Sequence, residues 1–123
     1  MAEDRVSGGI RTVFVVEDDP ESLRGMADAI VAEGYTVKAF SDFEDAHRNL
    51  LQTLPDALLL DIRLGPFNGL HLAVIARQRS PTMRILVFSG FVDPVLIAEV
   101  ESLRARFMAK PLDYDDVLEY LRG

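Results

Sequence analysis

The sequence predicts a single α/β domain in which helices cover both faces of a parallel sheet. Short runs of Val, Leu, Ile and Phe alternate five times with longer segments that have helical periodicity. Five strand–helix units joined by short links imply right-handed crossovers, and these place helices on both faces of the sheet. At 123 residues, the chain has the length of one domain that can bury most of its unfolded surface.

The strands are expected where four to six mainly apolar residues stand together. These runs do not alternate between polar and apolar residues, which is typical of strands buried on both faces. The five predicted strands are residues 11–16, 36–40, 57–60, 84–88 and 106–109.

Apolar residues spaced by three and four positions predict a helix after each strand. Asp19, Asp93 and Asp113 are expected as N-caps, with a proline following the first two, and Gly34 is expected to close the first helix. Residues 1–9 fit none of these elements and are predicted to form a flexible tail before a domain at residues 10–123. The five apolar stripes run from Leu23 to Val31, Phe43 to Leu54, Leu70 to Arg77, Leu96 to Leu103 and Tyr114 to Leu121.

Composition excludes several classes of function. The net charge of −7 argues against direct nucleic-acid binding, which normally uses a basic face. The absence of cysteine excludes disulfides and thiolate metal sites. The acidic N-terminus does not resemble a signal peptide, and no apolar run approaches the roughly 18 residues that a membrane span needs. These features predict a cytoplasmic domain without a membrane partner.

Charged and hydroxyl residues stand where four of the predicted strands end. The carboxyl ends of parallel strands lie at one edge of the sheet, so these side chains are expected to share a pocket. Such a pocket suits a divalent cation and a phosphoryl group. Asp19 is assigned to the helix cap and not to this pocket. The residues at the strand ends, Asp19 included, are Glu17, Asp18 and Asp19 after the first strand, Asp61 after the third, Ser89 after the fourth and Lys110 after the fifth.

The chemistry of these residues favours phosphorylation of a carboxylate. A carboxylate can attack phosphorus to form an acyl phosphate, and Mg²⁺ is typically held by one or two carboxylates while it keeps water and phosphate ligands. We expect Asp18 to bind Mg²⁺ directly and Glu17 to bind it through water. Asp61 and the backbone carbonyl of Arg63 complete the set of protein ligands, and Mn²⁺ is expected to substitute for Mg²⁺.

The successive motifs resemble the receiver domain of two-component response regulators over residues 11–122. This resemblance implies a flavodoxin-like three-layer fold with strand order 2-1-3-4-5. It also implies that a histidine kinase or histidine phosphotransfer protein supplies a phosphoryl group to Asp61. The motifs are Val15–Pro20, Leu59–Leu64, Asn68–Gly69, Val87–Gly90 and Phe107–Pro111.

Four residues have expected roles beside the acceptor Asp61. Lys110 is expected to neutralise one phosphoryl oxygen, and the Ser89 hydroxyl is expected to hydrogen-bond another. By resemblance, Phe107 is an aromatic switch that turns inward when Ser89 moves, and Pro111 has a structural role. Such a domain catalyses its own phosphorylation and slow dephosphorylation without being a conventional enzyme. The implied partners are a downstream protein target or effector domain, with a phosphorylation-dependent dimer as a further form.

Some residues depart from the family pattern or allow another interpretation. Asn68 stands where aspartate is usual, and the proline of the same loop comes one residue late, at Pro66. Arg63 and Phe91 are expected to overhang the phosphorylation site. His47 and His71 are interpreted as packing or surface residues. The alternative function is a receiver-like interaction module that works without phosphorylation, and the sequence leaves open whether the domain stands alone or is part of a larger regulator.

Overall fold

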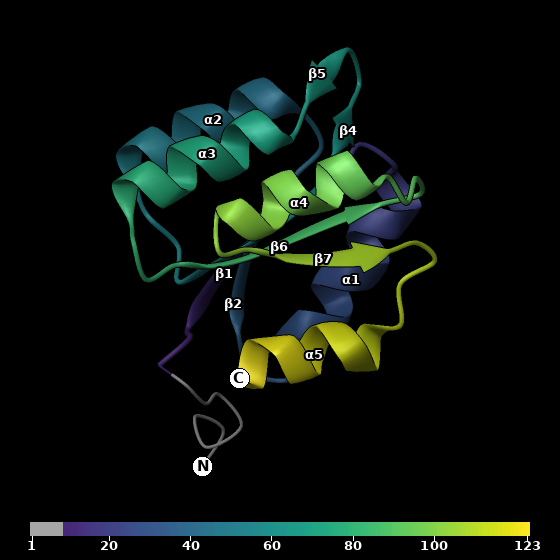
Figure 1. Ribbon diagram of the computed structural model, residues 1–123. Helices are drawn as coiled ribbons and strands as arrows, with labels where there is room; N and C mark the ends of the chain where they lie inside the picture. Colours follow the sequence, from purple (N-terminus) through teal and green to yellow (C-terminus); the bar gives the residue numbers. More distant parts are fainter. Residues whose placement is uncertain (1–8) are drawn as a thin grey trace.

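A computed structural model describes residues 9–123 and confirms the predicted α/β architecture (Figure 1). The main sheet has the order β2-β1-β3-β6-β7, and all neighbouring pairs are parallel. Counted as strands of this sheet alone, the order is the predicted 2-1-3-4-5. Residues 1–8 of the expected tail lie outside the described residues. The strands are β1 (Thr12–Val16), β2 (Thr36–Phe40), β3 (Ala57–Asp61), β6 (Arg84–Ser89) and β7 (Arg106–Ala109).

The described residues form five helices, and they cover the two faces of this sheet (Figure 1). On one face, α1 (Pro20–Ala32) and α5 (Tyr114–Arg122) pack on a core that includes Val13, Val15 and Leu59. On the other face, α2 (Phe43–Gln52), α3 (Leu70–Arg79) and α4 (Pro94–Ser102) pack on a second core. Successive residues of a strand point to opposite faces, so each central strand contributes to both cores. The result is a three-layer sandwich.

Side-chain caps begin the helices where the sequence predicted them. The backbone N–H of Ser22 donates to the Asp19 carboxylate at 3.0 Å. Asp93 likewise accepts from the N–H of Val95 at 2.9 Å, and Asp113 caps α5. Gly34 follows α1 with a φ of 101°, a left-handed conformation that glycine adopts without strain. The first helix therefore ends as predicted.

The prediction that every strand is buried on both faces is wrong for the two edge strands. In β2, Thr36, Lys38 and Ala39 are exposed, and in β7 both end residues are exposed. The helices cover the centre of the sheet most completely, so an edge strand needs fewer apolar residues than its short Val and Phe run suggested. The central strand β3 is buried throughout.

The second helix is shorter than predicted, and the loop after β3 is more ordered. Helix α2 ends at Gln52, because Thr53 is extended and Leu54 precedes Pro55, a position that disfavours helical backbone. After β3, the chain forms a hairpin of β4 (Arg63–Leu64) and β5 (Phe67–Asn68), which was not predicted. Within residues 9–123, no helix combines the length and apolar character needed to cross a membrane.

Candidate functional site

The strand register brings the predicted polar residues to one edge of the sheet. Val16 lies beside Leu60 in the β1–β3 pair, and Asp61 lies beside Phe88 in the β3–β6 pair. Glu17, Asp61 and Ser89 therefore follow or end neighbouring strands. They are 1%, 5% and 2% exposed, and they are the buried polar residues of the part of the chain that the structure describes. Buried carboxylates need a compensating partner.

Three carboxylates form a compact acidic cluster. Glu17, Asp18 and Asp61 each offer an oxygen that lies within 4.8 Å of the others. Oxygen donors at this spacing suit a hard divalent cation such as Mg²⁺. Asp18 is oriented by the N–H of Gly65, which donates to its Oδ2 at 3.1 Å. The carboxylate of Asp19 instead caps α1, so these two neighbouring acids have different positions: Asp18 lies in the acidic cluster and Asp19 at the start of the helix.

Lys110 is the cation of the site. Its Nζ donates to Oδ2 of Asp61 and, at 3.2 Å, to Oε2 of Glu17. The N–H of Lys110 donates to the carbonyl of Ser89 at 2.8 Å, which places the lysine at the end of β7, before the cis peptide bond to Pro111. Burial acts to lower the pKa of Lys110, but the hydrogen bond to Asp61 and the charges of Asp61 and Glu17 raise it above its ordinary value. Lys110 is therefore a firmly charged group.

Burial and the neighbouring acid Asp61 both disfavour the charged form of Glu17. Burial, followed by the hydrogen bond and charge interaction with Asp61, raises the pKa of Glu17 to about 7. The charge of Lys110 acts in the opposite direction. A divalent cation among these oxygens would favour the charged carboxylates. The donor set and its electrostatics thus fit Mg²⁺.

Ser89 ends β6, and Phe107 lies on the adjacent strand β7. Oγ of Ser89 accepts a hydrogen bond from the N–H of Phe91 at 3.0 Å, and its hydroxyl proton can still be donated elsewhere. Phe107 lies beside Val87 in the β6–β7 register and packs, partly buried, against the core under α4. Its role as a switch stays a prediction, as does the Arg63 carbonyl as a metal ligand.

Arg63 and Phe91, which the sequence placed above the site, contact each other. The guanidinium carbon of Arg63 lies 5.0 Å from the centroid of the Phe91 ring, a cation–π contact. Arg63 also donates its backbone N–H to Oδ1 of Asp61 at 3.0 Å. The contact connects the hairpin after β3 to the loop after β6.

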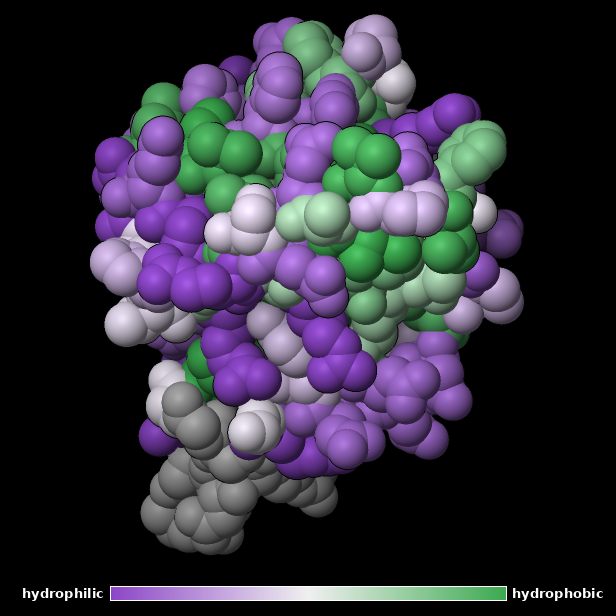
Figure 2. Space-filling view, in the orientation of Figure 1, coloured by the Kyte–Doolittle hydropathy of each residue, from purple (hydrophilic) through white to green (hydrophobic). Residues whose placement is uncertain are grey.

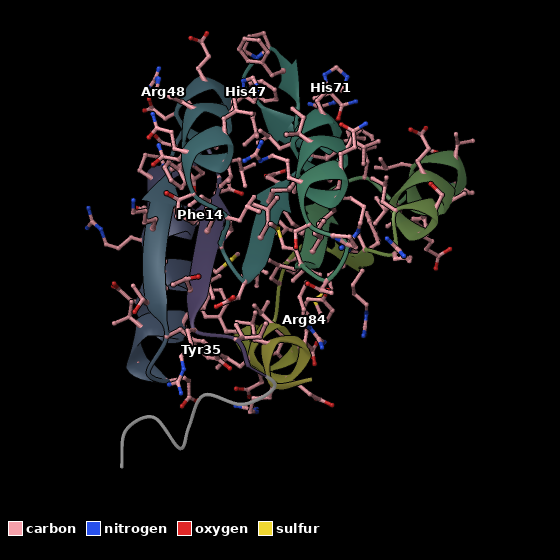
Figure 3. The ribbon with its side chains drawn as sticks, turned by 90° about the vertical axis from the view of Figure 1, so that its left-hand side faces the viewer. Phe14, Tyr35, His47, Arg48, His71 and Arg84 are labelled. Carbon is pink, nitrogen blue, oxygen red and sulfur yellow. The ribbon has the colours of Figure 1, made fainter. Side chains whose placement is uncertain are left out.

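Sequence reasoning missed a second anchor of the hairpin. The ring of Phe67 stacks on that of Phe43 at the start of α2, with centroids 4.8 Å apart. Gly65-Pro66 was the available signal, because it favours a turn that would fold the loop back on itself. The side chain of His47 is half-buried beside Phe43, whereas His71 is exposed at the start of α3 (Figure 3). Neither histidine belongs to the acidic cluster.

Comparison with known proteins identifies the family. The family model of the response regulator receiver domain matches residues 13–122. This chain belongs to that family. The photosynthetic apparatus regulatory protein RegA of Cereibacter sphaeroides is 30% identical over an alignment of 125 positions, which covers 98% of this chain and 67% of RegA. The transcriptional regulator NtrC of Proteus hauseri is 32% identical over 109 residues, which cover 86% of this chain but only 23% of NtrC.

Solved structures of receiver domains have the same fold. A CheY-like receiver domain protein from Methanospirillum hungatei has a TM-score of 0.86 and 21% identity, covering 93% of this chain and 92% of that protein. A Burkholderia pseudomallei response regulator, solved with a phosphorylated aspartic acid, calcium ion and citrate, has a TM-score of 0.83 and 22% identity. That match covers 90% of this chain and 66% of the other. These TM-scores confirm that this chain has the receiver fold.

The close approach at Gly69 gives a stability prediction for this receiver domain. A Cβ at Gly69 would lie 2.2 Å from the carbonyl oxygen of Asp61, whereas one at Gly90 would have no neighbouring atom within 4 Å. We expect Gly69→Ala to lower the free energy of unfolding by about 2 kcal/mol or more, because backbone must shift to admit the methyl group. Gly90→Ala should change it by less than about 0.5 kcal/mol. Urea denaturation measures both, and equal stabilities would contradict the packing argument.

Proposed function

We propose that this receiver domain accepts a phosphoryl group on Asp61 from a histidine kinase or histidine phosphotransfer protein, in a reaction that requires Mg²⁺. The observation that carries the proposal is the Glu17–Asp18–Asp61 cluster with Lys110 paired to Asp61. A nucleophilic carboxylate, a set of metal ligands and a fixed cation lie together at one edge of the sheet. Phosphoryl transfer depends mainly on positioning and charge neutralisation, and these residues supply both.

In the proposed reaction, one carboxylate oxygen of Asp61 attacks phosphorus. The bond between phosphorus and the donor nitrogen breaks, and the nitrogen keeps the electron pair. Bound Mg²⁺, or Mn²⁺ in its place, would offset the negative charge of the phosphoryl oxygens. Lys110 already contacts Asp61 and needs only to shift toward a phosphoryl oxygen, while the Ser89 hydroxyl donates to another.

Known receiver proteins support this proposal by analogy. The Burkholderia pseudomallei response regulator carries both a phosphorylated aspartate and a divalent cation. This chain spans only 23% of NtrC, so the response that its phosphorylation triggers is also a matter of proposal. We infer that phosphorylation alters contacts with a downstream protein target or effector domain, and that it can also favour a dimer.

Beryllofluoride, which mimics the acyl phosphate, tests the function. With Mg²⁺ and beryllofluoride, we expect larger amide shifts in residues 90–110 than in α2. The reason is that Ser89 and the adjoining strand residue Phe107 would respond together and couple the site to the face of α4 and β7. NMR spectra measured with and without beryllofluoride decide this. A protein that binds neither Mg²⁺ nor beryllofluoride would instead be a receiver-like module that works without phosphorylation.

The Arg63–Phe91 contact predicts a long-lived acyl phosphate. Hydrolysis needs a water opposite the Asp61 oxygen, and this contact joins the loops beside that approach. Replacing the bulky ring in Phe91→Ser should shorten the lifetime of the phosphorylated form by about tenfold, or about 1.4 kcal/mol in barrier. Val92→Ser is the matched control, because Val92 is the next residue in the chain and its side chain is about as exposed as that of Phe91. Decay rates of the phosphoprotein give the answer, and a slower Phe91→Ser would contradict the water-exclusion argument.

A further inference from the structure

A groove lies between the β4–β5 hairpin and the beginning of α4. It has a volume of about 550 Å³. One wall is formed by Pro66 and Phe67 of the hairpin, and the other by Phe91, Val95 and Leu96. We call this feature the hairpin groove. Ser89 of the proposed phosphorylation site also lines it, whereas the three acids of the cluster are not among its lining residues.

Large apolar side chains on both walls of the hairpin groove are open to solvent. Phe67 is 42% exposed, Phe91 62% and Val95 67%. On the molecular surface, hydrophobic residues gather over the first turn of α4, the loop before it and the end of β7 (Figure 2). Single exposed apolar residues are ordinary, but several that line the two walls of one groove indicate an interaction site.

The charges of the hairpin groove favour a basic occupant. Asp93 and Glu99 line it on the side of α4, a helix that contains no lysine or arginine. The groove's one basic side chain, Arg63, has its guanidinium over the ring of Phe91. With a net charge of −7, a second copy of this chain would bring further acids toward these carboxylates. A partner with lysine or arginine is therefore the better match.

We propose that the hairpin groove binds an amphipathic helix of a partner protein, with its apolar face between Phe67 and Val95 and its basic residues beside Asp93 and Glu99. A groove of this volume accepts a few apolar side chains, which is how amphipathic helices anchor in hydrophobic grooves. The α4 wall offers side chains and not an open strand edge, so a helix suits it better than an added strand. This binding surface goes beyond the phosphoryl chemistry of the proposed function.

Two hydrogen bonds connect the hairpin groove to the proposed phosphorylation site. The N–H of Phe91 donates to Ser89, and the N–H of Arg63 donates to Asp61. The two residues that bring the groove walls together are thus bonded to the residues that would contact the phosphoryl group. A helix docked in the groove would also compete with the Arg63–Phe91 contact, because its apolar side chains would pack against the same ring.

The test uses two fluorescently labelled helical peptides of about 18 residues, one of leucine and lysine and the other of leucine and glutamate. Fluorescence anisotropy is measured without Mg²⁺ or a phosphoryl donor, so the result does not depend on whether Asp61 is phosphorylated. We expect the leucine–lysine peptide to bind and the leucine–glutamate peptide to bind at least about tenfold more weakly. Amide shifts on binding should map to the hairpin and the first turn of α4.

Two matched variants localise the binding. Val95→Asp should weaken binding of the leucine–lysine peptide about tenfold, whereas Val31→Asp, at an exposed valine of α1, should leave it unchanged. Both variants add the same negative charge, so general attraction of a basic peptide predicts no difference between them. Glu99→Gln should weaken binding by a smaller factor. Equal binding of the two valine variants, equal binding of the two peptides, or no binding to the wild type would each overturn the proposal.

Discussion

Asp61→Asn is expected to abolish uptake of a phosphoryl group from acetyl phosphate. The wild type should gain one group in the presence of Mg²⁺, seen by intact-protein mass spectrometry, and the variant should gain none. An amide has no negatively charged oxygen to attack phosphorus, although it has nearly the shape of the carboxylate. Its oxygen can still accept the hydrogen bond that Arg63 donates to Asp61, so the variant should keep the fold.

A matched substitution separates the reaction from a general loss of charge. Asp28 lies on the exposed face of α1, outside the acidic cluster, and Asp28→Asn removes the same charge. This control should be labelled like the wild type. Undiminished labelling of Asp61→Asn would show that another residue is the acceptor, and loss of labelling in Asp28→Asn would show that the assay reports net charge.

The fold was predictable because its signals are local and repeated. Each buried strand is a short apolar run, and the capping carboxylates Asp19, Asp93 and Asp113 lie at the helix starts where the sequence placed them. Errors arose where tertiary position decides burial. The run in β2 looks like a central strand, but it lies at the edge of the sheet, where no further strand covers it. A sequence pattern does not report which strands become edges.

The position of the candidate site was predictable for a different reason. Parallel strands bring their carboxyl ends together, so Glu17, Asp61 and Ser89 had to lie near one another once the sheet was assumed. The contacts between side chains were not predictable in this way. That Lys110 pairs with both Glu17 and Asp61 depends on side-chain conformations. The Phe43–Phe67 stack depends on a hairpin that the irregular sequence of the loop did not reveal.

Asp18→Ala is expected to weaken Mg²⁺ binding about 100-fold, whereas Asp19→Ala should change it little. The Asp18 carboxylate belongs to the acidic cluster, and Mg²⁺ depends strongly on its few protein carboxylates. The Asp19 carboxylate is occupied by hydrogen bonds from Ser22 at the start of α1. Its loss should instead lower the stability of the protein with or without metal, because a helix cap is removed. Isothermal titration calorimetry measures the affinities.

Unfolding experiments provide an independent readout of the same division of roles. A cation that binds only the folded protein, at 100 times its Kd, adds about 2.7 kcal/mol to the free energy of unfolding. At the same Mg²⁺ concentration, Asp18→Ala should lose most of this added stability. Asp19→Ala should be less stable than the wild type without metal but should gain the full increment when Mg²⁺ is added. Without metal, Asp18→Ala loses the hydrogen bond that Gly65 donates but also relieves the repulsion among three crowded acids, so its stability should stay within about 1 kcal/mol of the wild type. If Asp19→Ala loses the Mg²⁺ increment and Asp18→Ala retains it, the ligand and the cap have been assigned the wrong way round.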